Sequence, residues 1–208
     1  MTIPILIILA GGRSARMGTP KGLLDCKGTP WILEQISRYK NIHNPRVYIG
    51  LGYDYKLYFK QIPWFEIAIE HSYIYKGVKV SVFINNHPKF GPFSTLQTVL
   101  KKVSITDSVL VLPIDVPLLD EENLQRIVSE NNTIIIPTCN ANNGHPVKLN
   151  PVFWKTLLPL ENQLKKARLD VQIKNLNRSS KTFIEVDDIS VYQNINTIKK
   201  WNEYIDLF

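Results

Sequence analysis

An uninterrupted aliphatic run near the start of the chain, Ile3–Ala10, is the feature that most limits the possible folds. No polar side chain alternates with the apolar ones, so a strand formed here would be buried on both faces. Such strands are typical of parallel sheets that helices cover on both sides. Gly11 and Gly12 end the run and predict a tight turn directly after the strand.

The rest of the chain alternates strand and helix patterns, which favours an α/β class with a mostly parallel sheet between two helical layers. Further strands are expected at Arg46–Leu51, Glu66–Glu70, Val78–Ile84, Ser108–Pro113, Thr133–Pro137 and Thr182–Val186. Helices are expected at Trp31–Tyr39, Pro92–Lys102, Leu119–Asn131, Pro151–Leu160, Gln163–Lys174 and Thr197–Tyr204. Thr29-Pro30 and Asp120 suit helix N-termini, and Tyr53–Pro63 is expected to be a tyrosine-rich loop.

Length and composition exclude several classes of protein. The 208 residues fit one domain, 1–208, because chains divide into domains beyond roughly 250–300 residues. The first apolar run is shorter than the roughly 20 residues that cross a bilayer, and it has no basic segment before it, so we expect a cytoplasmic protein without a membrane partner. Cys26 and Cys139 stand in unrelated contexts, which excludes disulfides and structural zinc.

The formal net charge of +7, from 25 Lys and Arg against 18 Asp and Glu, favours an anionic partner. No nucleic-acid recognition motif is present, so a phosphorylated small molecule is favoured over nucleic acid. Nucleic-acid binding through the basic surface remains an alternative interpretation, and it rests on charge alone. The chain is expected to be a monomer or a weak homo-oligomer.

The turn after the first strand carries three cations, Arg13, Arg16 and Lys21, beside Gly11 and Gly12. Glycines allow the backbone to approach an oxyanion closely, so that N–H groups can point at phosphate oxygens. The turn is neither a Walker A loop nor a dinucleotide fingerprint. A polyphosphate ligand is the functional interpretation, and a solvated basic turn is the alternative.

A carboxylate follows the second very apolar strand, at Asp115. Ligands of open α/β sheets bind at the carboxyl ends of the strands, so Asp115 is expected at the same edge as the glycine turn. Magnesium prefers a few carboxylates together with phosphate oxygens. Asp115 is therefore a candidate Mg²⁺ ligand, or alternatively a cap of the following turn.

The string Leu9-Ala10-Gly11-Gly12-Arg13-Ser14-Ala15-Arg16-Met17-Gly18, followed by Lys21, resembles the signature loop of nucleotidyltransferases that activate sugar phosphates and cofactors. It is most similar to the molybdenum cofactor guanylyl- and cytidylyltransferases. The resemblance implies a Rossmann-like, three-layer fold of the nucleotide-diphospho-sugar transferase type. It also implies transfer of a nucleoside monophosphate from a magnesium-bound NTP to an acceptor phosphate, with release of pyrophosphate.

The positions that match the motif imply roles for individual residues. Arg16, Lys21 and Asp115 would be catalytic, with the two cations neutralising the triphosphate and Asp115 holding the metal. The nucleotide would lie against Leu9, Ala10, Gly11, Gly12, Arg13 and Ser14.

Three later segments are similar to the family in the same order. In Asn85–Leu96, the Asn85 side chain, the backbone near Gly91 and Ser94 would meet the base and ribose. Amides stand here where the guanylyl branch has an acid, which favours CTP over GTP. Asn194 and Asn196 would complete the metal site, unless Asn196 or Thr197 only caps the last helix.

His145, in Gly144-His145-Pro146-Val147, would lie on the acceptor side, although a lone histidine is more often structural. Residues 161–167 lack the Gly-Asp-x-Gly turn usual in the cytidylyl branch. Molybdopterin is the favoured acceptor, with a sugar or polyol phosphate as the alternative. A nucleotide-binding adaptor without turnover is the competing hypothesis to an enzyme.

Overall fold

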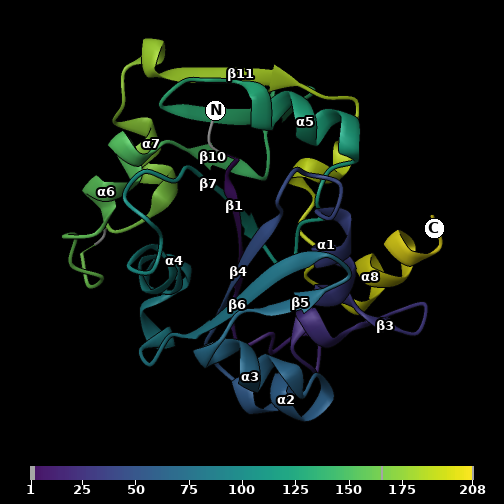
Figure 1. Ribbon diagram of the computed structural model, residues 1–208. Coiled ribbons are helices and arrows are strands. Elements are labelled where there is room, and N and C mark those ends of the chain that lie inside the picture. Colours follow the sequence, from purple (N-terminus) through teal and green to yellow (C-terminus); the bar gives the residue numbers. More distant parts are fainter. Residues whose placement is uncertain (1–2, 165, 208) are drawn as a thin grey trace.

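The computed structural model describes residues 3–164 and 166–207. Within these residues, nine strands form one mixed sheet and two more form a small separate hairpin (Figure 1). The aliphatic run forms β1, which lies between β7 and β4 and pairs in parallel with both. The four parallel central strands are β1 (Ile5–Ala10), β4 (Arg46–Leu51), β6 (Val78–Ile84) and β7 (Val109–Pro113). The predicted central strand is therefore confirmed.

The outer strands make the sheet mixed, in the order β11-β8-β10-β7-β1-β4-β6-β5 with β9 paired to β8. β10 runs antiparallel between β7 and β8, whereas β11 lies parallel to β8. β5 runs antiparallel to β6 at the other edge. Their bounds are β5 (Tyr73–Tyr75), β8 (Ile134–Cys139), β9 (Asn142–Asn143), β10 (Val147–Leu149) and β11 (Lys181–Glu185).

Helices cover both faces of the sheet, giving the three layers that the pattern predicts (Figure 1). Successive residues of β1 alternate between the two cores: Leu6 and Ile8 face one, and Ile5 and Ile7 face the other. The first core lies under α1 (Trp31–Arg38), α2 (Tyr55–Gln61), α3 (Trp64–Glu70), α5 (Glu121–Ser129) and α8 (Ile198–Ile205). The second lies under α4 (Pro92–Leu100), α6 (Pro151–Leu157) and α7 (Leu169–Lys174).

None of the helices in the described residues has both the length and the apolar character needed to cross a membrane.

The prediction of a strand over Glu66–Glu70 is wrong, because this segment belongs to helix α3. Ile67 and Ile69 alternate with other residues as in a strand, but they are 56% and 36% exposed. Phe65 and Ala68, three positions apart, are the buried residues instead. Burial thus follows the helical period, and the alternation lies on the exposed side.

The expected loop Tyr53–Pro63 contains a second helix, α2. Its residue Tyr58 is 1% exposed, so this aromatic residue belongs to the core rather than to a solvated loop. Trp64 of α3 stacks on Tyr73 of the edge strand β5, with ring centroids 4.6 Å apart. Helix α3 therefore packs through an aromatic side chain against the β5 end of the sheet, and Tyr58 of α2 stacks on Phe65 of α3 with ring centroids 6.3 Å apart.

The helix predicted at Gln163–Lys174 is too long, because α7 begins only at Leu169. Arg168 is extended, with φ −142° and ψ 136°, and its guanidinium binds the Asp170 carboxylate at 3.0 and 2.9 Å. The buried Ala167 packs into the second core just before this extended residue. Position 165 of the prediction lies outside the described residues.

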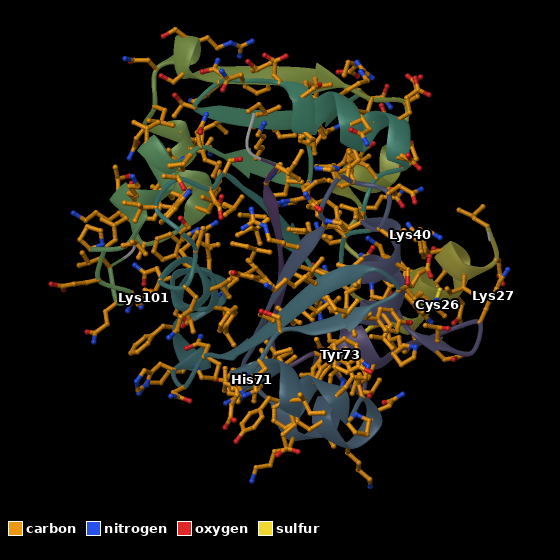
Figure 2. All side chains as sticks on the ribbon, viewed as in Figure 1. Cys26, Lys27, Lys40, His71, Tyr73 and Lys101 are labelled. Atoms are coloured by element: carbon orange, nitrogen blue, oxygen red, sulfur yellow. The ribbon has the colours of Figure 1, made fainter. Side chains whose placement is uncertain are left out.

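Thr29-Pro30 directly precedes α1, as predicted, with Pro30 at the N-cap position, but neither residue caps the helix through its side chain. They form β3 (Thr29–Pro30), which pairs with β2 (Asp25–Cys26) in the separate hairpin, and α1 follows without a side-chain cap. Figure 2 shows Cys26 and Lys27 in this hairpin. The other predicted cap is confirmed: Asp120 accepts a hydrogen bond from the Asn123 N–H at 2.9 Å at the start of α5.

Candidate functional site

The carboxyl ends of β1 and β7 meet at one edge of the sheet, and the candidate site begins there. Leu9 lies opposite Pro113 in the parallel register, and the Ile114 N–H donates to the Leu9 carbonyl at 3.1 Å. The glycine turn and the segment carrying Asp115 therefore leave the sheet side by side. A cavity of about 290 Å³ opens at this edge, lined by Leu9, Ala10, Gly11, Gly12, Ser14, Lys21, Pro88, Gly91, Pro92, Thr95, Pro113, Ile114 and Asp115.

Lys21 and Asp115 are in direct contact in this cavity. The Lys21 Nζ lies 2.8 Å from the Asp115 Oδ2, and the two side chains are 14% and 19% exposed. The same ammonium group donates to the Asn196 Oδ1. The Ile195 N–H donates to the Asp115 carbonyl at 2.8 Å, which ties the segment before α8 to the site. Three sequence segments thus place two oxygen donors around one cation.

The turn between β1 and Lys21 is closed by Ser14. The Ser14 Oγ accepts a hydrogen bond from the Lys21 N–H at 3.1 Å, and the Ser14 carbonyl accepts one from the Met17 N–H at 2.8 Å. Ser14 has a φ of 51°, in the left-handed region that glycine adopts most easily. The Arg13 guanidinium lies over the Tyr53 ring, with its Cζ 4.5 Å from the ring centroid, whereas Arg16 is exposed.

The two glycines of the turn have different surroundings. A Cβ on Gly11 would lie 2.6 Å from the Thr95 Oγ1, and a Cβ on Gly52 would lie 2.6 Å from the Gly11 carbonyl oxygen. Glycine is therefore required at both positions by close packing of β1, β4 and α4. A Cβ on Gly12 would meet no atom within 4 Å, so the fold itself does not require glycine there.

Asn85 and Ser94, predicted to meet the base, are joined to each other. The buried Asn85 amide donates to the Ser94 Oγ at 2.8 Å and to the Thr95 Oγ1 at 3.0 Å. Its Oδ1 accepts from the His87 N–H at 2.9 Å. The Ser94 Oγ donates in turn to the Gly91 carbonyl at 2.8 Å. These side chains shape the turn from β6 into α4, and the backbone of Gly91 lines the cavity.

His145 lies beside β7 and does not line the cavity that contains Lys21. Its Nδ1 is 3.3 Å from the Val111 carbonyl oxygen, which implies that this nitrogen carries the proton. Burial lowers the pKa of His145, against smaller upward effects of the Val111 hydrogen bond and the Asp115 charge. The ring is therefore held neutral near pH 7, and it lines a second, larger cavity.

The donor set at Lys21 fits a magnesium ion that also binds phosphate. Asp115 and Asn196 offer a carboxylate and an amide oxygen, the hard ligands that Mg²⁺ prefers. Across the described residues, no group of three or more His, Cys, Asp or Glu could hold a metal without further ligands. Asn194 is exposed, and no described hydrogen bond joins it to Asp115 or Lys21.

Sequence reasoning missed Thr95, Tyr53 and Gly52 as parts of this edge. Thr95 packs against Gly11, and the Tyr53 N–H donates to the Gly11 carbonyl at 3.2 Å. The Tyr53 ring also makes the cation–π contact with Arg13. Glycines within and just after a strand, as at Gly50 and Gly52, signal close backbone approach and offered a clue.

Two curated proteins show distant similarity to the chain. The molybdenum cofactor guanylyltransferase of Xanthomonas euvesicatoria is 27% identical over 123 residues, which cover 59% of this chain and 52% of that protein. The molybdenum cofactor biosynthesis bifunctional protein of Synechocystis is 21% identical over 202 residues, covering 95% of this chain and 52% of that protein. The chain thus spans about half the length of these curated relatives.

Solved structures show the same fold. Rv0371c from Mycobacterium tuberculosis H37Rv superposes with a TM-score of 0.70 at 19% identity, covering 99% of both chains. A second structure of that protein, described as a complex with manganese, has a TM-score of 0.68 at 17% identity and covers 100% of both chains. At these identities the likeness concerns the fold.

The model of one family matches residues 6–179, from β1 to the segment before β11. This range contains the glycine turn, Asp115 and His145, and it leaves out Asn196. The match covers most of the chain. The chain belongs to the family of proteins with a MobA-like NTP transferase domain.

Proposed function

We propose that this chain transfers a nucleoside monophosphate from an NTP to a phosphorylated small molecule and releases pyrophosphate. One observation carries the proposal: the 2.8 Å contact between Lys21 and Asp115 at the carboxyl edge of the sheet, beside the glycine turn. A cation, a carboxylate and a glycine turn in one cavity are the groups that a metal-bound triphosphate requires.

Each group has a role in this reaction. Lys21 and the exposed Arg16 would neutralise the triphosphate, and the open space around Gly12 would allow its backbone to approach the phosphates. Asp115 and Asn196 would hold Mg²⁺, which supplies charge neutralisation to the triphosphate and the leaving pyrophosphate. The divalent metal is consistent with the manganese complex described for Rv0371c.

The attacking group would be a phosphate oxygen of the acceptor. It is already anionic near pH 7, so the reaction needs no general base. Alignment of the acceptor with the α-phosphate and neutralisation of charge would supply the rate enhancement. The neutral His145 is therefore not required as a base in this mechanism.

CTP is the first nucleotide to test, because Asn85 and the Gly91-Pro92-Phe93-Ser94 turn resemble the cytidylyl branch. The structure assigns the Asn85 amide to the turn, so the base edge would be met mainly by backbone near Gly91. Molybdopterin is the first acceptor, since the two curated relatives carry molybdenum cofactor names.

The test is pyrophosphate release from each of the four NTPs with Mg²⁺ and molybdopterin. Asp115→Asn should lower the rate about 100-fold or more, because a metal ligand supplies several kcal/mol of charge stabilisation. Thermal unfolding should show that the variant stays folded, and the exposed Glu122→Gln serves as the matched control. An unchanged rate in Asp115→Asn would remove this residue from the mechanism.

Binding of a fluorescent NTP analogue separates the enzyme from the adaptor hypothesis. Magnesium-dependent binding without pyrophosphate release from any NTP, across molybdopterin, sugar phosphates and polyol phosphates, would favour a nucleotide-binding adaptor.

A further inference from the structure

A second cavity of about 610 Å³ lies on the α4 and α7 side of the sheet and is larger than the cavity at Lys21. We call it the apolar cavity. The two cavities share three wall residues, Leu9, Pro92 and Pro113, so they adjoin at the carboxyl ends of β1 and β7. Helices α4 and α7 lie on the same side of the sheet (Figure 1). A molecule in the apolar cavity is therefore adjacent to the triphosphate site.

The walls of the apolar cavity are mostly aliphatic and aromatic. They include Phe93 and Leu96 from α4, Ile173 from α7, and Val111 and Ile136 from the sheet. Such a surface favours alkyl or aryl groups, because the gain in free energy grows with the apolar area removed from water.

Two polar groups at the apolar cavity, the His145 Nδ1 and the Arg168 guanidinium, have partners within the chain, whereas the Asn143 and Lys174 side chains are exposed. The His145 Nδ1 faces the Val111 carbonyl, and the Arg168 guanidinium is held by two hydrogen bonds to Asp170 at the exposed rim. Against the aliphatic and aromatic walls, the hydroxyl groups of a sugar or polyol would lose their water without gaining a polar partner, which is unfavourable. The apolar walls therefore favour an alkyl or aryl group over a polyhydroxylated one.

We propose that the apolar cavity holds the alkyl or aryl body of the acceptor, and that the acceptor is a phosphomonoester with an apolar body. This inference rests on the proposed function, whose acceptor class it narrows. The acceptor phosphate oxygen forms a bond to the α-phosphorus of the NTP, and the bond from that phosphorus to the bridging oxygen of the β-phosphate breaks. Pyrophosphate leaves with the electron pair, and the product is a diphosphate diester.

The probe is 1-naphthyl phosphate, titrated by calorimetry into the full chain in the presence of Mg²⁺. Inorganic phosphate and glucose 1-phosphate are the comparison ligands. Burial of the naphthyl ring should make the probe bind about tenfold tighter or more than inorganic phosphate. Equal affinities for the probe and inorganic phosphate, no binding of the probe, or tighter binding of glucose 1-phosphate would each overturn the inference.

Two variants test whether the probe binds in the apolar cavity. Ala167→Phe should fill part of the cavity, and Ile173→Glu should put a charge in its wall; each should weaken probe binding about tenfold or more. Val152→Glu on the neighbouring helix α6 is the matched control, since Val152 is 69% exposed and outside the cavity. Unfolding curves select the variants that remain folded.

Magnesium-dependent NTP binding, measured on the same proteins, separates a failure of the acceptor site from a failure of the proposed function. Wild-type affinity for the NTP in Ala167→Phe and Ile173→Glu, with loss of probe binding, supports the apolar cavity as the acceptor site. Probe binding that both folded variants retain would overturn the inference while leaving the proposed function standing. If the wild type does not bind the NTP, or if its turnover does not depend on Asp115, the proposed function itself is wrong.

Discussion

Lys21 holds the two oxygen donors that a metal would use. Its ammonium group contacts both Asp115 and Asn196. A divalent cation that binds these two oxygens must therefore compete with the Lys21 ammonium. A triphosphate offers the lysine new anionic partners, and the lysine would then release the carboxylate. Metal and nucleotide are therefore expected to bind together more favourably than the metal binds by itself.

Lys21→Met should raise the affinity for Mn²⁺ in the absence of nucleotide by about tenfold, because the competing cation is gone. The same variant should bind the NTP more weakly, since it lacks a triphosphate partner. Free Mn²⁺ measured by electron paramagnetic resonance gives the metal affinity. Lys102→Met, an equal loss of charge at an exposed residue beyond the C-terminal end of α4, should leave that affinity unchanged. Weaker Mn²⁺ binding in Lys21→Met would contradict the competition.

Helix α5 shows how an element is held at its two ends by groups of different origin. Asp120 caps the N-terminus from within the local sequence. Lys148, a buried residue of β10, donates to the Val128 and Glu130 carbonyls at 2.7 and 2.6 Å at the C-terminus. Its positive charge there complements the helix dipole, although burial lowers the pKa of Lys148.

Asp120→Ala should destabilise the protein by about 1 kcal/mol, the usual effect of losing a side-chain N-cap. Urea unfolding measures the free energy of unfolding, and the dependence on urea concentration should stay that of the wild type. Glu122→Ala, in the first turn of the same helix but without a capping bond, is the control. Equal stability of the two variants would show that the Asp120 bond contributes nothing.

At the scale of the whole molecule, His145 makes the stability of the fold depend on pH. Because burial lowers the pKa of His145, the unfolded chain takes up a proton that the folded chain resists as the pH falls below about 6.5. The stability that neutral His145 contributes is therefore present above that pH and is lost as the pH falls through the folded-state pKa.

His145→Gln should make the stability of the protein depend less on pH. Between pH 7.5 and pH 5, the melting temperature of the wild type should fall more than that of His145→Gln, because only the wild type has this buried imidazole to protonate on unfolding. His43→Gln, at an exposed histidine, should follow the wild type. Parallel pH profiles for the wild type and His145→Gln would contradict the assignment.

Much of the architecture could be predicted because local patterns report burial directly. The uninterrupted apolar runs at Ile5–Ala10 and Val109–Pro113 are strands buried on both faces. Since the carboxyl ends of parallel strands share one edge of a sheet, the sequence predicts that the glycine turn and Asp115 lie at the same edge. Segments buried on one side only were harder, and the alternation at Ile67 and Ile69 misled because it lies on the exposed side of α3.

The sequence by itself determined the central strands, the helical layers and the chemical types of the residues at the sheet edge. Only the tertiary structure decided which groups meet: Asn196 reaches Lys21 across 175 positions, and Asn85 turns inward to Ser94. It also inserted the short antiparallel strand β10 between β7 and β8, which places His145 beside the apolar cavity. The physical reason is that periodicity reports whether a residue is buried, whereas the partner of a polar group depends on packing between distant segments.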